Sequence, residues 1–156
     1  MTVYRRFPGV TSVVAALMTR EFGALLGEVS SAADHVGSAR DRLVAAAVLA
    51  VERLVRDPLL TSVLDRDADL LLPYLVERVG STQRLAEKFI VELLVAGHAD
   101  GSIRVAPVDA QARLFFLTVQ AFVLSHRPAV ADVSPADLLG ELAASLDHGL
   151  RPGGDA

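Results

Sequence analysis

The chain lacks several features that would assign it quickly to a class of protein. Its 156 residues include no cysteine and no tryptophan. Without cysteine, disulfides and thiolate metal sites are excluded, and a reducing compartment, by default the cytoplasm, is the expected location. The longest unbroken apolar run, residues 43 to 51, falls far short of the ~20 residues of a membrane span. The first residues also lack the apolar core of a signal peptide, so we expect no membrane partner.

Motifs for catalysis and for metal binding are missing as well. The sequence contains no G-x-S-x-G, no Walker loop and no dinucleotide-binding glycine pattern. Its four histidines lie far apart and form no H-x-x-x-H pair, so we interpret them as surface residues: His35, His98, His126 and His148. The sequence therefore predicts neither an enzyme, nor a metal site, nor a cofactor.

Positive charge is scarce. Fifteen lysines and arginines stand against nineteen aspartates and glutamates, which gives a net charge of −4 at pH 7. Nucleic-acid-binding domains usually show a basic patch or a high pI, so the chain as a whole offers no such electrostatic footprint. One local concentration of positive charge, Arg5-Arg6, lies close to the start of the sequence.

Helical periodicity is what the sequence does have. Apolar residues between Val10 and Val29 recur at three- and four-residue steps, which predicts an amphipathic helix that continues for a turn or two before Gly37. Ser38, with Asp41 three residues later, resembles a capping box. The run from Leu43 to Val51 that follows is apolar on every side, so we expect it to form the central helix of one globular domain.

The rest of the chain also consists of apolar helical stretches separated by residues that end helices or form turns. Asp57-Pro58 should end the central helix, and Pro73 should either begin or kink the helical stretch in which it lies. Asp100-Gly101 predicts a turn, followed by an extended link to Pro107. Further helices are expected at 59–64, 70–79, 82–97, 109–126 and 135–149. Strand-like alternation of useful length is absent, so the predicted fold class is all-α.

The start of the chain resembles part of a known family. Thr2, Tyr4 and Phe7, followed by Pro8-Gly9 and a long helix, are similar to the end of the DNA-binding head of TetR-family transcriptional regulators. Later stretches resemble the ligand-binding domains of that family: 57–60, 71–75, 99–104, 107–109 and 148–152. The resemblance implies a remnant of a helix-turn-helix at residues 1–9 and an effector-binding and dimerisation domain at residues 10–152.

The sequence also departs from the family. TetR regulators carry roughly forty residues before this point, which hold the first helices of the helix-turn-helix. Either Met1 reflects a late start, or the protein lacks a complete DNA-reading head. Val10 stands where a lysine is common, so a phosphate contact there is lost, whereas Arg6 retains chemistry suited to phosphate.

The resemblance implies three sets of site residues. DNA contacts would come from Thr2, Tyr4, Arg5 and Arg6, which could otherwise be a solvated helix end. An apolar effector pocket would be lined by Tyr74, Phe89, Leu93, Phe116 and Gln120, for which core packing is the simpler alternative. A homodimer formed as a four-helix bundle by the last two helices would use Leu117, Phe122, Leu124, Leu138, Leu142 and Leu146.

Two further expectations concern side chains on these helices. Phe115 and Phe116 point about 100° apart, so one should face a partner subunit and the other the interior. Arg53, Arg84 and Arg113 lie on otherwise apolar helices, where salt bridges or exposure to solvent are expected.

The function implied is that of a TetR-like regulator, expected to be a repressor, in which a small apolar effector shifts the tilt of the helix after Pro8-Gly9. Operator DNA would be a partner of the full-length protein. The alternatives are a helical protein-protein interaction or scaffold domain without a ligand and, more distantly, an α-helical enzyme.

Overall fold

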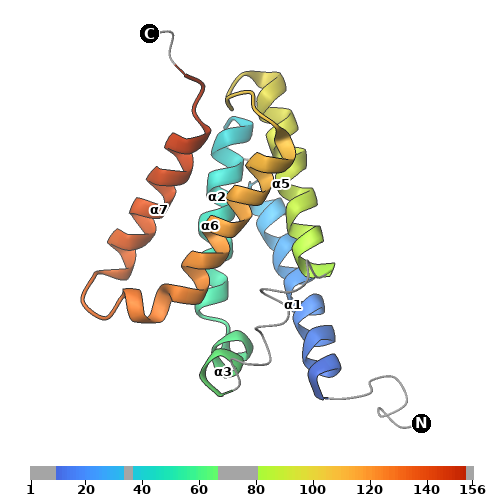
Figure 1. The fold of residues 1–156 in the computed structure, drawn as a ribbon, viewed down its shortest axis with the longest axis vertical. Helices are drawn as coiled ribbons and strands as arrows, with labels where there is room; N and C mark the ends of the chain where they lie inside the picture. The colour runs from blue at the N-terminus through green and yellow to red at the C-terminus, as the bar shows by residue number, and fades with distance from the viewer. Residues whose placement is uncertain (1–9, 34–36, 67–80, 154–156) are drawn as a thin grey trace.

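The computed structural model describes residues 10–33, 37–66 and 81–153, which fold largely into helices (Figure 1). No strand occurs in these segments, so the all-α prediction is confirmed. The helices are α1 (Val10–Ala33), α2 (Ala39–Val55), α3 (Pro58–Arg66), α5 (Ser81–Asp100), α6 (Val108–Ala129) and α7 (Pro135–Leu150). The predicted helical stretch with Pro73 lies outside the described residues.

Helix α2 is the centre of the domain, as its apolar run predicts. Its start is fixed by a capping box: the Ser38 hydroxyl accepts from the Asp41 amide at 3.2 Å, and the Asp41 carboxylate accepts from the Ser38 amide at 2.9 Å. From there α2 packs against α1, α5, α6 and α7. It supplies one buried face, made of Ala39, Leu43, Ala46, Ala47 and Val51.

Two apolar clusters hold the helices together. The larger one joins α2, α5, α6 and α7 and includes Leu43, Leu94 and Phe115. The smaller one is formed by Val29 and Ala33 of α1 with Ala46 of α2. Burial of apolar surface is the main favourable term in folding, so Val29 and Ala33 anchor the carboxyl-terminal half of α1 on α2.

Local signals place most helix boundaries within a few residues of the prediction. The Asp57 carboxylate accepts from the Leu60 amide at 2.7 Å and so starts α3 immediately after α2 ends. The Ser134 hydroxyl caps α7 by accepting from the Asp137 amide at 3.3 Å, with proline at the first helical position. Helix α6 continues to Ala129, three residues further than expected, because Pro128 is accommodated in its last turn.

The link between α5 and α6 differs most from expectation. Gly101 turns the chain with a φ of 74°, as the Asp100-Gly101 pair predicts. Ile103, expected in an extended link, instead folds back onto α5 and is among the most deeply buried side chains. Its amide donates to the Gly97 carbonyl at 3.0 Å, and a Cβ on Gly97 would come within 2.4 Å of the Ile103 side chain. The glycine therefore permits this close approach.

Candidate functional site

The predicted DNA contacts, Thr2, Tyr4, Arg5 and Arg6, lie outside the described residues. The described helix that follows them is α1, which runs from Val10 through the expected span to Ala33. Its residues Ala16, Leu17 and Arg20 are exposed. Further along, Glu28 forms an ion pair with Arg53 of α2, and Val29 is buried beneath it in the smaller cluster. Helix α1 is thus held near one end, and side chains nearer its start are in contact with solvent.

The predicted effector residues divide between the two clusters. Phe89 of α5 packs against the smaller cluster, between α1, α2 and α5. Leu93 and Phe116 pack against the larger one, and Gln120 is half-buried on α6. Tyr74 lies outside the described residues. The four described side chains therefore border the core on two neighbouring sides, and packing alone accounts for the positions of the three apolar ones.

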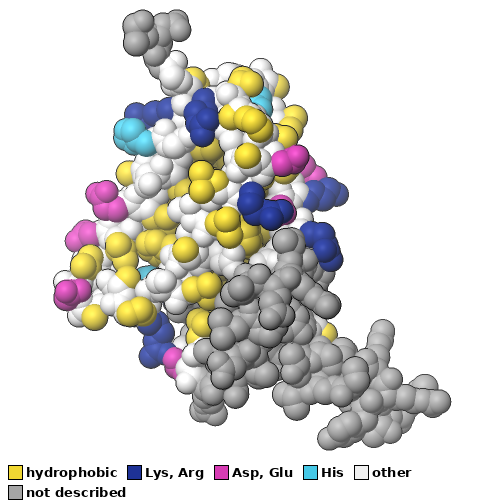
Figure 2. All heavy atoms as spheres, in the orientation of Figure 1, with side chains coloured by type: hydrophobic (Ala, Val, Ile, Leu, Met, Phe, Trp, Pro, Cys, Tyr) yellow, Lys and Arg dark blue, Asp and Glu magenta, His cyan; other side chains and the backbone are white. Residues whose placement is uncertain are grey.

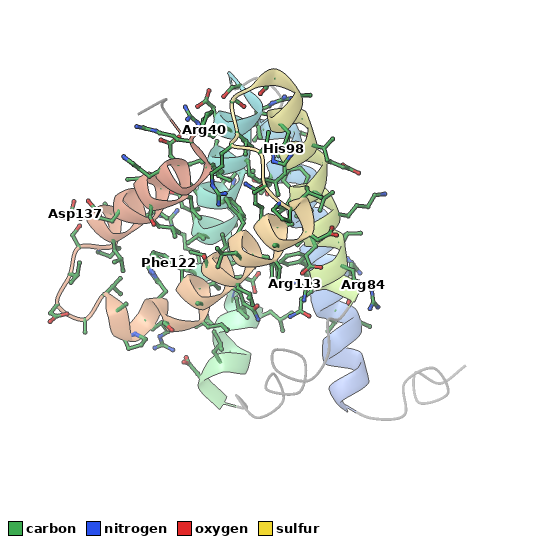
Figure 3. All side chains as sticks on the ribbon, turned by 45° about the horizontal axis from the view of Figure 1, so that its top comes forward. Arg40, Arg84, His98, Arg113, Phe122 and Asp137 are labelled. Atoms are coloured by element: carbon green, nitrogen blue, oxygen red, sulfur yellow. The ribbon has the colours of Figure 1, made fainter. Side chains whose placement is uncertain are left out.

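The arginines on apolar helices behave as the sequence suggests. Arg53 pairs with Glu28, and Arg113 of α6 pairs with Glu87 of α5. The Arg113–Glu87 pair also includes a hydrogen bond of 3.2 Å between Nη2 and Oε2. Arg84 is exposed, and Figure 3 shows it on the same side of the molecule as Arg113. Arg53 and Arg113 thus link pairs of helices through ion pairs.

The three histidines among the described residues differ in their exposure to solvent, although all were expected at the surface. His148 is exposed, and its Nδ1 lies 3.1 Å from the Ala144 carbonyl oxygen. His98 and His126 are instead half-buried, which corrects the surface interpretation for both. The His126 ring lies 5.7 Å from the Phe122 ring, and its Nδ1 is buried without a hydrogen-bond partner. Within the described segments, no three histidine or acidic side chains are grouped so as to hold a metal ion.

A polar region that the sequence did not reveal lies where α2 begins and where α5 and α7 end. We call this region, residues 38–42, 98–104 and 147–151, the polar end; Figure 3 labels its Arg40 and His98. The Asp100 carboxylate accepts from the Ala39 amide at 3.1 Å, and the Ser102 hydroxyl accepts from the Arg40 amide at 3.2 Å. Two amides at the start of α2, which have no partner within the helix, are thereby satisfied by residues about sixty positions away.

Two acidic groups of the polar end, Asp100 and Asp41, are stabilised in their charged form. Hydrogen bonds from the Ser102 side chain and backbone, and from the Ala39 amide, lower the pKa of Asp100. Hydrogen bonds from the Ser38 side chain and backbone lower the pKa of Asp41. Arg40 reaches across to Asp147 of α7, with 3.1 Å between Nε and Oδ1. This end of the molecule therefore joins α2, α5 and α7 through charged and polar contacts, whereas Nε of Arg42 is buried without a hydrogen-bond partner.

The predicted dimer residues do not share one surface. Leu142 and Leu146 are buried in the larger cluster, because α7 turns this face towards α2. They thus lie inside the subunit, a correction to the expected exposed apolar surface. Phe122 and Leu124 of α6 and Leu138 of α7 are half-buried. Periodicity correctly grouped the α7 leucines but could not show what covers them.

Two of the large apolar side chains that face solvent lie on α6; the others described are Leu17, Leu85, Val95, Val105 and Val133. Leu114 is 65% exposed and Leu117 is 49% exposed, whereas Phe115 is buried and Phe116 packs against the core. Phe115 is thus the inward-facing residue of the pair and Phe116 is half-buried, so the expectation that one phenylalanine faces a partner subunit stays a prediction. We call Leu114, Leu117 and the exposed Ala121 the outer face of α6. Figure 2 shows hydrophobic side chains gathered over α6 and between α6 and α7.

Comparison with known proteins assigns the chain to a functional class. It is 31% identical, over 151 residues, to an uncharacterized HTH-type transcriptional regulator of Mycobacterium bovis, a match that covers 96% of this chain and 74% of that protein. Two HTH-type transcriptional regulators of Mycobacterium tuberculosis, from the CDC 1551 and H37Rv strains, are 30% identical over the same shares. The chain belongs to the HTH-type transcriptional regulators. No family model and no solved structure matches it.

Membership of this class gives the described helices a context. The HTH-type regulators that the chain resembles are named for control of transcription, not for catalysis. Within the described part of the chain, no helix is both long enough and apolar enough to cross a membrane.

Proposed function

We propose that this HTH-type regulator is TetR-like and acts as a repressor, with residues 10–152 forming its effector-binding and dimerisation domain. Residues 1–9 would be the end of the recognition helix, with Thr2, Tyr4, Arg5 and Arg6 facing DNA phosphates. The observation that carries the proposal is α1, a 24-residue helix that directly follows the TetR-like opening sequence. A cytoplasmic location follows from this role.

The proposed dimer pairs α6 and α7 with the same helices of a second copy. The outer face of α6 supports this, because two leucines that are about half exposed or more, Leu114 and Leu117, lie within one turn of each other. Contiguous exposed apolar surface of this kind commonly marks an interaction site. Phe122, Leu124 and Leu138 would border the contact. Leu142 and Leu146 would support it from inside the subunit.

The proposed effector is a small apolar molecule that binds between α1, α2, α5 and α6, beside Phe89, Leu93, Phe116 and Gln120. Phe89 packs on the cluster that anchors α1, so a ligand displacing it would change how α1 rests on α2. A ligand that prefers one orientation of α1 shifts the population towards it. In a dimer, this would change the spacing of two DNA-reading heads.

Sedimentation and mobility-shift measurements test the proposal directly. The chain should sediment as a dimer at micromolar concentration, and the full-length protein should bind an operator with strong dependence on salt. Apolar ligands that bind the domain should release that DNA. A chain that remains monomeric, or a full-length protein whose DNA affinity no apolar ligand changes, would contradict the dimerisation or the effector part of the proposal respectively.

A scaffold domain without a ligand is the second candidate. It is favoured by the packing of Phe89, Leu93 and Phe116 against the two clusters, which accounts for these residues without any pocket. The two candidates separate in a Phe89→Ala variant. A ligand-binding domain should lose affinity for its apolar ligand, whereas a scaffold should lose only stability.

A further inference from the structure

The relative position of α6 and α7 must be set by more than their own contact. Both helices pack on α2, and the short loop at residues 130–134 joins them at one end. From that loop they diverge, so that the start of α6 and the end of α7 lie apart (Figure 1). A second link is therefore needed to fix the opening between them.

Arg104 provides such a link. It lies in the loop that leads into α6, and its amide donates to the Leu150 carbonyl at 2.9 Å. Its Nε donates to the Gly149 carbonyl at 2.8 Å. Carbonyls in the last turn of a helix have no partner within the helix, and a positive side chain is favourable there. Arg104 thus attaches the start of α6 to the end of α7.

Gln111 holds Arg104 in place. It is 7% exposed and is the single buried polar residue found in the described segments. Its Nε2 donates to the Arg104 carbonyl at 3.1 Å, so its Oε1 is left to accept from His98 Nε2 at 2.8 Å. His98 must therefore carry a proton on Nε2. The chain of bonds runs from α5 through α6 to the end of α7.

We propose that His98, Gln111 and Arg104 form a brace that sets the opening between α6 and α7 and thereby the shape of the dimer surface. Gln111 is a positioning residue, because it acts on α7 through the carbonyl of Arg104. The effect on dimerisation rests on the proposed function. The effect on the opening is a property of one subunit.

The absence of cysteine makes the opening measurable in the whole chain. Spin labels on cysteines introduced at the exposed positions Ala110 and Ser145 report the distance between α6 and α7. An excess of unlabelled chain keeps labels from meeting across a dimer. In Arg104→Met and in Gln111→Leu we expect a longer and broader distance distribution. The dimer Kd should rise about tenfold, as the loss of one hydrogen bond implies.

Arg151→Met is the matched control. Arg151 also lies at the end of α7 and carries the same charge, but its side chain bonds Asp147 within the same segment, with 2.9 Å between Nε and Oδ2. It should leave the distance distribution and the dimer Kd unchanged. NMR of the His98 ring supplies a readout that loss of stability alone would not move: the fixed Nε2-H form should be lost in Gln111→Leu.

Each outcome of these experiments supports or overturns a stated part of the proposal. Distances that stay narrow in both brace variants, or that change equally in Arg151→Met, would overturn the brace. Changed distances with an unchanged dimer Kd would overturn its role in dimerisation. A wild-type chain that is monomeric would remove the proposed dimer, while the distances within one subunit would still test the opening. Should Gln111→Leu fail to fold, Arg104→Met carries the test by itself.

Discussion

The polar end and the outer face of α6 differ in what their side chains contact. At the polar end, Asp100, Ser102 and Arg104 satisfy backbone groups of other elements and so join separate helices of one subunit. On the outer face, Leu114 and Leu117 remain exposed although the core beneath them is full. The polar end thus stabilises the subunit, whereas the outer face is the surface proposed to meet a second copy. Mutations in the two regions should therefore have different consequences.

Leu117→Glu on the outer face is expected to have the largest effect. Burying an unpaired carboxylate in an apolar contact costs several kcal/mol, so the dimer Kd should rise about a hundredfold. Far-UV circular dichroism should show unchanged helicity, because the side chain is 49% exposed in the subunit. Sedimentation equilibrium measures the Kd.

Val95→Glu is the matched control for that experiment. Val95 is similarly exposed, but it lies on α5, outside the proposed dimer surface. Its Kd should match that of the unmodified chain. If Val95→Glu weakens the dimer and Leu117→Glu does not, the outer face of α6 is not the contact.

Gly97→Ala, beside the polar end, should act on the subunit itself. The added Cβ would meet the buried Ile103 side chain, and relieving that overlap costs about 1–3 kcal/mol of unfolding free energy. Gly140→Ala on α7 meets nothing within 4 Å and should instead add roughly 0.5–1 kcal/mol, because alanine favours the helix. Urea unfolding of both variants checks the opposite signs. Equal destabilisation of the two would argue against the close approach.

Ser38→Ala measures how much the capping box at the start of α2 contributes to the free energy of unfolding. Loss of the hydroxyl removes two of the three hydrogen bonds between Ser38 and Asp41, and a lost cap typically costs about 1 kcal/mol. Asp41→Asn, which retains an acceptor for the Ser38 amide, should cost less. Urea midpoints of the two variants measure the difference, and a larger loss in Asp41→Asn would contradict the importance of the hydroxyl.

Local caps and long-range contacts differ in how well the sequence predicts them. The Ser38 and Ser134 caps can be predicted because their partners lie three residues away. The bond between Arg104 and Gly149 spans 45 positions, and no local pattern indicates it. For α7, periodicity groups the leucines correctly, but a helix face carries the same pattern whether its own core or a partner covers it. The sequence therefore predicts the helices more reliably than it predicts the effector and dimer surfaces.

The smallest expected effect is the pH dependence of the polar end. Hydrogen bonds, first among them that from the Ser102 side chain, lower the pKa of Asp100, so the folded chain binds its proton less tightly than the unfolded chain does. The associated stability is present above the unfolded pKa, about 3.9, and is lost as the pH falls through the lower folded value. Asp100→Asn should therefore flatten the decline in the urea midpoint below about pH 4.

Ser102→Ala tests the cause of that effect without removing the carboxylate. Without the hydroxyl, the pKa of Asp100 should move back towards its ordinary value, which carbon NMR of the carboxyl group measures directly. The amides of Ser102 and Ala39 would still donate to the carboxylate, so the return should be partial. An unchanged pKa would mean that the amides alone stabilise the charge, and that the polar end depends on its backbone geometry more than on its side chains.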